Sequence, residues 1–328
     1  MDALYEVLEN VKRVPLMPAV TPLHRMERLE KLWNYDGIYI KRDDMTGIGT
    51  GGNKIRSLEF ILGDALEKRS DKILVSGPGQ SNLCMLTAAA CAKLGLGCEV
   101  IHNCEKPGKP EGNLLLNHIL GVKSHFLGNV DSAVRNAYME NLAKQEEARG
   151  HKPYVVRNGA TTGMGALGYV AAVPELKKQC EEAGIDGLTI FAPGGNGGVA
   201  TGLIYGNALL GMPFQIVIVS VEDDRKTLTA HIQVTLHELE EITGVRMPQS
   251  FETACSILED FRGDGWGVNT EESAAAVFEF ARQEGIFIEN VYNSKVLTGM
   301  KKLAEKGAVK GNICYLHTGG IGSLFAQY

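Results

Sequence analysis

Three times in this chain, a short apolar run ends in a glycine-rich loop that leads directly into a helical pattern. The apolar runs lie at 38–41, 72–76 and 188–192, and the helical patterns begin near residues 54, 81 and 199. A strand, a glycine loop and a helix in this order are the parts of a parallel βαβ unit. The repeated order predicts an α/β protein of the doubly wound type.

Length and composition narrow the class of protein. The chain has 328 residues, which favours two subdomains around one cleft. Its net charge of −6 argues against nucleic-acid or anionic-membrane partners, and no segment has the roughly 20 apolar residues of a membrane span. Seven cysteines without a Cys-x-x-Cys pair, and no secretory signal in residues 1–16, predict reduced core cysteines in a cytoplasmic protein.

Lys54 is the first candidate functional residue. It follows Gly51 and Gly52 and stands in the first turn of a predicted helix, where the helix dipole disfavours an ammonium and so favours a nucleophilic amine. The two glycines allow a flat ligand or another backbone to come close. The alternative is an ordinary solvated lysine.

A second candidate site is the polar run Gln80-Ser81-Asn82, which follows the strand at 72–76 and begins the next helix. Ligands of open α/β sheets bind at such carboxyl ends of strands. Ser81 by itself is typical of a helix N-cap. Asn82 beside it is a second cap-type residue that one helix start does not require, which favours a binding role.

The third candidate site is the glycine loop at 193–198, between a strand and a helix. Its consecutive N–H groups at a helix N-terminus predict an anion site, contributed by Gly194, Gly195, Asn196, Gly197 and Gly198. The spacing fits neither the dinucleotide fingerprint nor a Walker A loop, which indicates a single phosphate. A reactive lysine and a monophosphate site on an α/β scaffold together suggest pyridoxal 5′-phosphate.

A series of motifs covers nearly the whole chain: Ile40-Lys41-Arg42-Asp43-Asp44, Gly51-Gly52-Asn53-Lys54, Gln80-Ser81-Asn82, Gly165-Ala166-Leu167-Gly168-Tyr169, the glycine loop, Glu284-Gly285-Ile286, Val291-Tyr292 and His317-Thr318-Gly319-Gly320. In these motifs and in their order, the chain resembles the family of D-cysteine desulfhydrases and 1-aminocyclopropane-1-carboxylate deaminases. The resemblance implies two open, mostly parallel twisted sheets flanked by helices, as in the tryptophan-synthase-β type of pyridoxal enzyme (fold type II). It also implies a large cofactor-binding domain (1–56 and 162–328) and a small inserted α/β domain (57–161).

The resemblance also implies roles for individual residues. Catalytic roles fall to Lys54, which would bind the cofactor covalently, and to Ser81 and Tyr292. Cofactor contacts would come from Lys54, Asn53, Asn82, Gly194, Gly195, Asn196, Gly197, Gly198, Asn293 and Thr318. The substrate pocket would be lined by Gln80, Ser81, Asn82, Trp266 and Tyr292. No metal site is expected, since no histidine pair has metal-binding spacing.

Three positions depart from the family pattern. Asn293 stands where an acid or a threonine is expected to face the pyridine nitrogen of the cofactor, and a neutral amide would not keep that nitrogen protonated. Trp266 stands at a tyrosine position, and an indole cannot exchange a proton as a phenol can; it would be a pocket wall or a core aromatic. Val199 replaces a phosphate-binding threonine, for which Thr201 could compensate.

The resemblance, taken with these departures, implies a pyridoxal-phosphate-dependent lyase that catalyses α,β-elimination from a small amino acid, most readily D-cysteine or a β-substituted analogue. Asn293 is compatible with elimination of a good leaving group and unfavourable for opening a cyclopropane ring. The alternatives are a 1-aminocyclopropane-1-carboxylate deaminase or a cysteate sulfo-lyase-like enzyme and, in another class, a non-catalytic protein that binds a phosphate ligand. A homodimer is expected.

Overall fold

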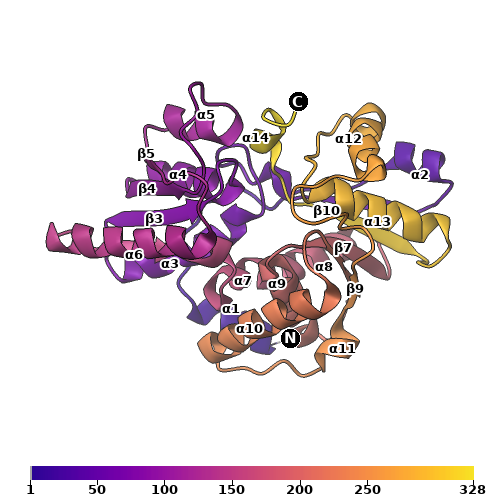
Figure 1. Cartoon of the computed structure of the whole chain (residues 1–328). Helices are drawn as coiled ribbons and strands as arrows, with labels where there is room; N and C mark the ends of the chain where they lie inside the picture. The colour runs from indigo at the N-terminus through magenta and orange to yellow at the C-terminus, as the bar shows by residue number, and fades with distance from the viewer. Residues whose placement is uncertain (1) are drawn as a thin grey trace.

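The computed structural model describes residues 2–328 and contains two open sheets flanked by helices (Figure 1). One sheet has six strands in the order β1-β2-β10-β7-β8-β9, and the other has four in the order β5-β4-β3-β6. All neighbouring strands run parallel except β1 and β2. The predicted fold class, with two mostly parallel sheets, is confirmed.

The six-stranded sheet has a hydrophobic core on each face. Its strands are β1 (Leu23–Arg25), β2 (Ile38–Arg42), β7 (Leu188–Gly194), β8 (Phe214–Ser220), β9 (Ser256–Leu258) and β10 (Asn312–His317). Neighbouring residues of a strand point to opposite faces, so Ile216 and Ile218 enter one core and Val217 and Val219 the other. The first core is covered by α7 (Gly163–Val170), α8 (Ala172–Ala183), α9 (Gly198–Leu209) and α10 (Arg225–Thr243). The second is covered by α2 (Glu27–Trp33), α12 (Glu271–Glu284) and α13 (Asn293–Glu305).

The four-stranded sheet is built from β3 (Lys72–Gly77), β4 (Gly97–His102), β5 (Lys123–Phe126) and β6 (Pro153–Val156). One face packs on α3 (Lys54–Glu67) and α4 (Asn82–Leu94), and the other on α6 (Ser132–Ala148). All four strands lie within 57–161, the segment expected as the inserted domain; the boundaries of that domain remain a prediction. Figure 1 shows this sheet and α6 beside the six-stranded sheet.

The remaining helices are short or peripheral. They are α1 (Asp2–Asn10), α5 (Gly112–Ile119), α11 (Phe251–Ala254) and α14 (Ile321–Leu324), with two 3₁₀ turns at Asp43–Met45 and Asn158–Ala160. No helix within residues 2–328 is long and apolar enough to cross a bilayer. All seven cysteines are unpaired, as expected, but Cys98, Cys104 and Cys255 are only half-buried, so the prediction that every cysteine lies in the core is wrong for these three.

A buried network of charges holds the first turns of α3 to the six-stranded sheet and α8. Arg56 donates to both oxygens of Asp43 (2.8 Å each) and to both oxygens of Glu175 (2.9 Å each). Tyr169 also donates to Asp43 (2.7 Å), and Lys41 donates to Glu175. Asp43 is fully buried and Arg56 is 1% exposed, so these charges depend on one another for solvation. The network thereby fixes the helix that begins with Lys54.

Replacing Asp43 by alanine tests this network. Asp43→Ala leaves the buried guanidinium of Arg56 with one acidic partner in place of two, and removing one member of a buried ion pair costs about 3–5 kcal/mol. We expect a loss of that size in the free energy of unfolding, measured by urea denaturation. The control Asp36→Ala, at an exposed carboxylate, should stay within about 0.5 kcal/mol of the parent. A loss below about 1 kcal/mol for Asp43→Ala would contradict the interpretation.

Candidate active site

Lys54 is the first residue of α3, and the backbone before it is pressed against the end of β10. Gly52 forms an isolated β-bridge with Gly319, and the N–H of Asn53 donates to the carbonyl of Thr318 (3.0 Å). A Cβ on Gly319 would lie 2.5 Å from the Cα of Gly52, so only a glycine fits there. The helix that carries Lys54 therefore begins at the carboxyl end of the six-stranded sheet, where such folds bind ligands.

The side chain of Lys54 bonds to a backbone carbonyl. Its Nζ donates to the carbonyl of Gly159 (2.9 Å), and no salt bridge to Lys54 occurs within residues 2–328. Burial lowers the pKa of Lys54 from 10.5 to about 8, because the ammonium is desolvated and no anion compensates. A lysine with this pKa has a substantial neutral fraction near physiological pH, as a nucleophilic amine requires.

The glycine loop faces the same region with free backbone donors. The N–H groups of Gly195, Asn196 and Gly197 donate to no described residue, and α9 starts at Gly198 with the unpaired N–H groups of a first helical turn. Gly197 has φ +94°, and a Cβ there would lie 3.0 Å from Ile232 Cγ1. The loop is therefore shaped by glycine and can receive an anion through its amides.

Tyr292 and Trp266 stand beside this loop. A Cβ on Gly195 would lie 3.2 Å from Cε1 of Tyr292, so the phenol ring rests on the loop. The indole Nε1–H of Trp266 donates to the Tyr292 hydroxyl (2.8 Å). Burial raises the pKa of Tyr292 to about 12, while the bond from Trp266 acts in the opposite direction. Trp266 is 43% exposed, so it is not a core aromatic.

Asn293, which follows Tyr292, is buried and its amide is fully engaged by the protein. Its Oδ1 accepts from the Tyr315 hydroxyl (2.7 Å) and from the N–H of Thr318 (3.1 Å). Its Nδ2 donates to Glu289 Oε1 (2.9 Å) and to the carbonyl of Gly319 (2.7 Å). Asn293 thus joins the start of α13 to the end of β10 and has no hydrogen left for another acceptor.

These contacts form a closed ring. Lys54 reaches Gly159, and a Cβ on Gly159 would lie 3.3 Å from Nδ2 of Asn196 in the glycine loop. The loop touches Tyr292, and the next residue, Asn293, accepts a hydrogen bond from the Thr318 N–H. The Thr318 carbonyl in turn accepts a hydrogen bond from the N–H of Asn53, the residue before Lys54. The predicted residues that the structure brings together in this ring, or directly on it, are Asn53, Lys54, Gly195, Asn196, Trp266, Tyr292, Asn293 and Thr318.

The run Gln80-Ser81-Asn82 approaches the ring from α4. Ser81 is the N-cap of α4, and its Oγ accepts from the N–H of Cys84 (3.3 Å), which leaves its hydrogen free to donate. Nδ2 of Asn82 lies 3.2 Å from where a Cβ of Gly320 would be, just after β10. The Gln80 amide donates to the Glu111 carbonyl and accepts from the Asn113 N–H, so it anchors the start of α5; its place in the substrate pocket remains a prediction.

Because Val199 has no hydroxyl, any side-chain donor to an anion in the glycine loop must come from a neighbouring residue. Thr201 does not compensate for Val199, because it is buried and its Oγ1 donates to the carbonyl of Gly197 (3.0 Å) within its own helix. Thr161 was not foreseen: its Oγ1 lies 3.3 Å from where a Cβ of Gly198 would be, with no hydrogen-bond partner among the described residues. The only sequence signal was the pair Thr161-Thr162 before the glycine-rich start of α7.

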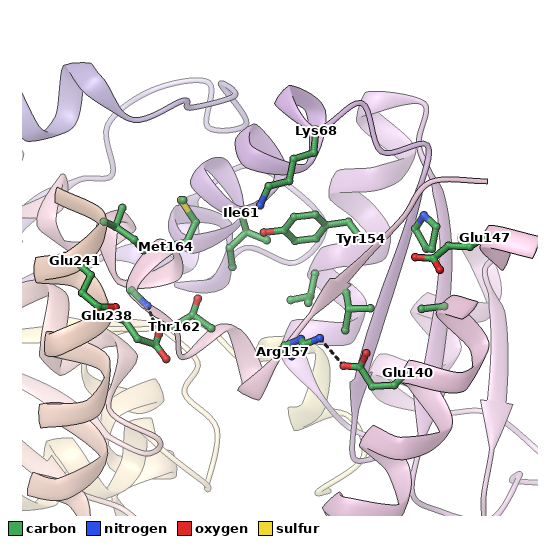
Figure 2. A pocket seen from close by; sticks show the side chains of 16 residues that line it. Ile61, Lys68, Glu140, Glu147, Tyr154, Arg157, Thr162, Met164, Glu238 and Glu241 are labelled. Atoms are coloured by element: carbon green, nitrogen blue, oxygen red, sulfur yellow. Dashed lines mark hydrogen bonds and ion pairs between the residues drawn. The ribbon is translucent and has the colours of Figure 1, made fainter. Parts of the chain in front are cut away.

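A surface groove of about 580 Å³ lies close to the ring but is a separate feature (Figure 2). Its lining includes Arg157, Thr162 and Gly163, which flank the segment touching Lys54, and four glutamates from α6 and α10. Figure 2 shows Arg157 paired with Glu140 across it. The groove contains none of the predicted site residues. Among residues 2–328, no group of three His, Cys, Asp or Glu side chains could hold a metal ion.

Comparison with known proteins identifies the family. The sequence pattern of pyridoxal-phosphate-dependent enzymes matches residues 14–319. A putative 1-aminocyclopropane-1-carboxylate deaminase of Pyrococcus horikoshii is 35% identical over 98% of this chain and 96% of its own length, and one of Pyrococcus furiosus is 34% identical over 97% and 95%. The chain belongs to the 1-aminocyclopropane-1-carboxylate deaminase and D-cysteine desulfhydrase family of pyridoxal-phosphate-dependent enzymes. Its cofactor is pyridoxal 5′-phosphate.

Solved structures agree with this assignment. An ACC deaminase homologue superposes with a TM-score of 0.90 at 32% identity, over 99% of this chain and 97% of its own. The processed form of a threonine deaminase from Solanum lycopersicum superposes with a TM-score of 0.66 at 14% identity, over 97% and 84%, which supports the fold alone. The residues present fit the cofactor, because a partly neutral lysine and a glycine loop with free amides stand on one ring of contacts.

The glycine loop can be tested by adding bulk. Gly197→Val should raise the dissociation constant for pyridoxal phosphate at least tenfold, since the new side chain is strained at φ +94° and meets Ile232. Absorbance titration of cofactor-free protein gives this constant. Gly211→Val is the matched control: it is strained too, at φ +80°, but has nothing within 4 Å, so it should lower stability and change the dissociation constant less than about twofold. Equal binding by the parent and Gly197→Val would refute the assignment.

The lowered pKa of Lys54 can be tested without cofactor. Only the neutral amine reacts with acetic anhydride, so the acetylation rate of Lys54 should rise through pH 8 and level off above it. A lysine in a model peptide, whose pKa is about 10.4, should still be gaining rate at about pH 9.5. Peptide mass spectrometry after brief labelling measures both rates. A Lys54 profile that follows the model peptide would show that burial does not shift this group.

Proposed function

We propose that this protein is a lyase that catalyses α,β-elimination from a small amino acid, with D-cysteine as the favoured substrate. D-Cysteine and water would give pyruvate, ammonia and hydrogen sulfide. The observation that carries the proposal is the fully engaged, neutral amide of Asn293 at a position where the resemblance implies a contact with the pyridine nitrogen. The cytoplasmic location and the homodimer expected from sequence remain predictions.

The residues on the ring and beside it have different roles in the proposed reaction. Pyridoxal phosphate supplies the electron sink that stabilises negative charge at the substrate Cα. Lys54 binds the cofactor and, once released, takes the α-proton at Nζ. The free Ser81 hydroxyl and the Asn82 amide bind and orient the substrate carboxylate, and the Tyr292 hydroxyl gives a proton to the departing sulfur.

The phosphate would be held by the backbone N–H groups of the glycine loop. The Thr161 hydroxyl would add one side-chain donor beside Gly198, in the role that Val199 cannot fill. Asn53 and Thr318 would hold the start of α3 in place through their backbone bond.

Elimination is favoured because Asn293 is a neutral amide, which cannot protonate the ring nitrogen. The nearest carboxyl, Glu289, accepts from the N–H groups of Val291, Tyr292 and Asn293 and from the Asn293 amide. A ring nitrogen without an acid partner is a weaker electron sink. Loss of a good β-leaving group requires less stabilisation of the carbanion than opening of a cyclopropane ring.

A 1-aminocyclopropane-1-carboxylate deaminase is the second candidate. It is supported by the names of the Pyrococcus relatives, which are described as putative deaminases of this kind. Against it stand Asn293 and Trp266, which replace an acid and a phenol that the resemblance leads one to expect.

A substrate panel decides between the candidates. The purified holoenzyme should release pyruvate and ammonia from D-cysteine and from β-chloro-D-alanine, and should not turn over 1-aminocyclopropane-1-carboxylate at a useful rate. Keto acid and ammonia are assayed for these compounds, their L-forms and D-cysteate. Robust turnover of 1-aminocyclopropane-1-carboxylate would establish the second candidate. The absence of any turnover would support a non-catalytic binding role.

Two variants test the roles of the hydroxyls in the same assay. Losing a positioned acid–base group lowers the rate about 10²- to 10⁴-fold, so Tyr292→Phe should lower the rate of D-cysteine turnover by a factor in that range. Ser81→Ala should lose both activity and about 1 kcal/mol of stability, whereas a residue that is only a helix cap would lose stability alone. Thr162→Ala serves as the cap control, because its Oγ1 accepts from Gly165 at the start of α7.

A further inference from the structure

The bond between Trp266 and Tyr292 has a direction that chemistry fixes. An indole N–H can only donate, so the Tyr292 oxygen is the acceptor in the 2.8 Å bond. The hydroxyl hydrogen of Tyr292 donates to no described residue. A tyrosine in place of Trp266 could donate or accept, and the Tyr292 hydrogen could then point at it. With tryptophan, that hydrogen is directed elsewhere.

The loop that carries Trp266 is held in place by hydrogen bonds from a buried lysine. Nζ of Lys295 donates to the carbonyls of Val221 (3.0 Å), Arg262 (2.6 Å) and Gly265 (2.7 Å). These three bonds use all three hydrogens of the ammonium. Because Lys295 lies on α13, three residues after Tyr292, one helix holds both the phenol and the loop of its partner.

The phenol itself has little freedom to move. Its ring lies against Gly195, and its backbone N–H donates to Glu289 (2.9 Å). The position of the oxygen is therefore set by backbone and ring, and the direction of its hydrogen by Trp266. A hydrogen bond from the indole also becomes stronger when the phenol loses its proton, because the acceptor is then charged.

We propose that Trp266 is a positioning residue, whose indole N–H orients the Tyr292 hydroxyl toward the substrate's leaving group and stabilises the phenolate formed when that proton is given up. The inference rests on the proposed function, in which Tyr292 protonates the departing sulfur. In that step the electron pair left at Cα after proton removal forms the Cα=Cβ double bond. The Cβ–S bond breaks with its electron pair on sulfur, and the proton of the Tyr292 hydroxyl moves to that sulfur.

The test replaces only the N–H. Trp266 is substituted by 3-benzothienylalanine, which has the shape of tryptophan but sulfur in place of the N–H, and the holoenzyme is assayed with two substrates. A thiolate leaving group benefits from protonation, whereas the chloride of β-chloro-D-alanine requires none. The substitution should lower kcat for D-cysteine about 10- to 100-fold, the effect of losing a hydrogen bond to a charged group, with KM changed less than about twofold. Turnover of β-chloro-D-alanine should change less than about twofold.

The other tryptophan is the matched control. Trp33 is buried, and its Nε1–H donates to Glu279 (3.4 Å), so the same substitution there removes an N–H that lies away from Tyr292. It should leave the ratio of the two rates unchanged. An equal loss on both substrates for the Trp266 variant would show a structural role only, and no loss on either would overturn the proposal. If the parent enzyme turns over neither substrate, the proposed function fails.

A second readout needs no catalysis. Tyr292 is replaced by 3-fluorotyrosine, and its ionisation is followed by ¹⁹F NMR in cofactor-free protein with Trp266 or with Trp266→Phe. Loss of the indole donor should shift the titration to higher pH, because the N–H favours the phenolate. Identical titrations in the two proteins would contradict the stabilising role of Trp266.

Discussion

The close approach of two glycine-bearing segments is the constraint on which the site depends. Gly52 and Gly319 lie so close together that a Cβ on Gly319 would be 2.5 Å from the Cα of Gly52. Gly51, beside Gly52, packs on the Asp44 carbonyl, which would lie 1.7 Å from a Cβ on Gly51. The contact between Gly52 and Gly319 sets the first turn of α3 on the carboxyl end of β10. Lys54 is therefore placed by backbone packing, and its side chain is free to serve the cofactor.

Two lysines without carboxylate bonds show how the protein controls charge. Lys295 gives all three of its hydrogens to backbone carbonyls, so every donor of its ammonium is satisfied. Lys54 has one acceptor, the Gly159 carbonyl, and its pKa falls to about 8. Burial lowers the pKa of both lysines, but the charges of Glu289 and Glu222 oppose the shift at Lys295, whereas no nearby charge opposes it at Lys54.

Asn293 links the electronic character of the site to its architecture. The amide that we propose faces the pyridine nitrogen in place of an acid also joins α13 to the residues after β10. Because Tyr292 precedes it and Lys295 follows it, one short segment contributes the phenol, the neutral amide and the anchor of the Trp266 loop. Replacing Asn293 by an acid would therefore also change the hydrogen bonds that join α13 to Thr318 and Gly319.

The local features of this protein could be predicted from its amino-acid sequence. Apolar runs, glycine loops and caps predicted the parallel sheets, the helix start at Lys54 and the helices that begin near residues 81 and 199, because these follow from short-range backbone preferences. The short strands at 123–126 and 153–156 were missed, since four residues carry little periodicity. The direction of each polar side chain, in contrast, depends on the three-dimensional packing. Packing bonded Gln80 to the start of α5, turned the Thr201 hydroxyl to the Gly197 carbonyl, used all the hydrogens of the Asn293 amide and set Trp266 on Tyr292. Those bonds join residues that are distant in sequence or depend on the contacts around them.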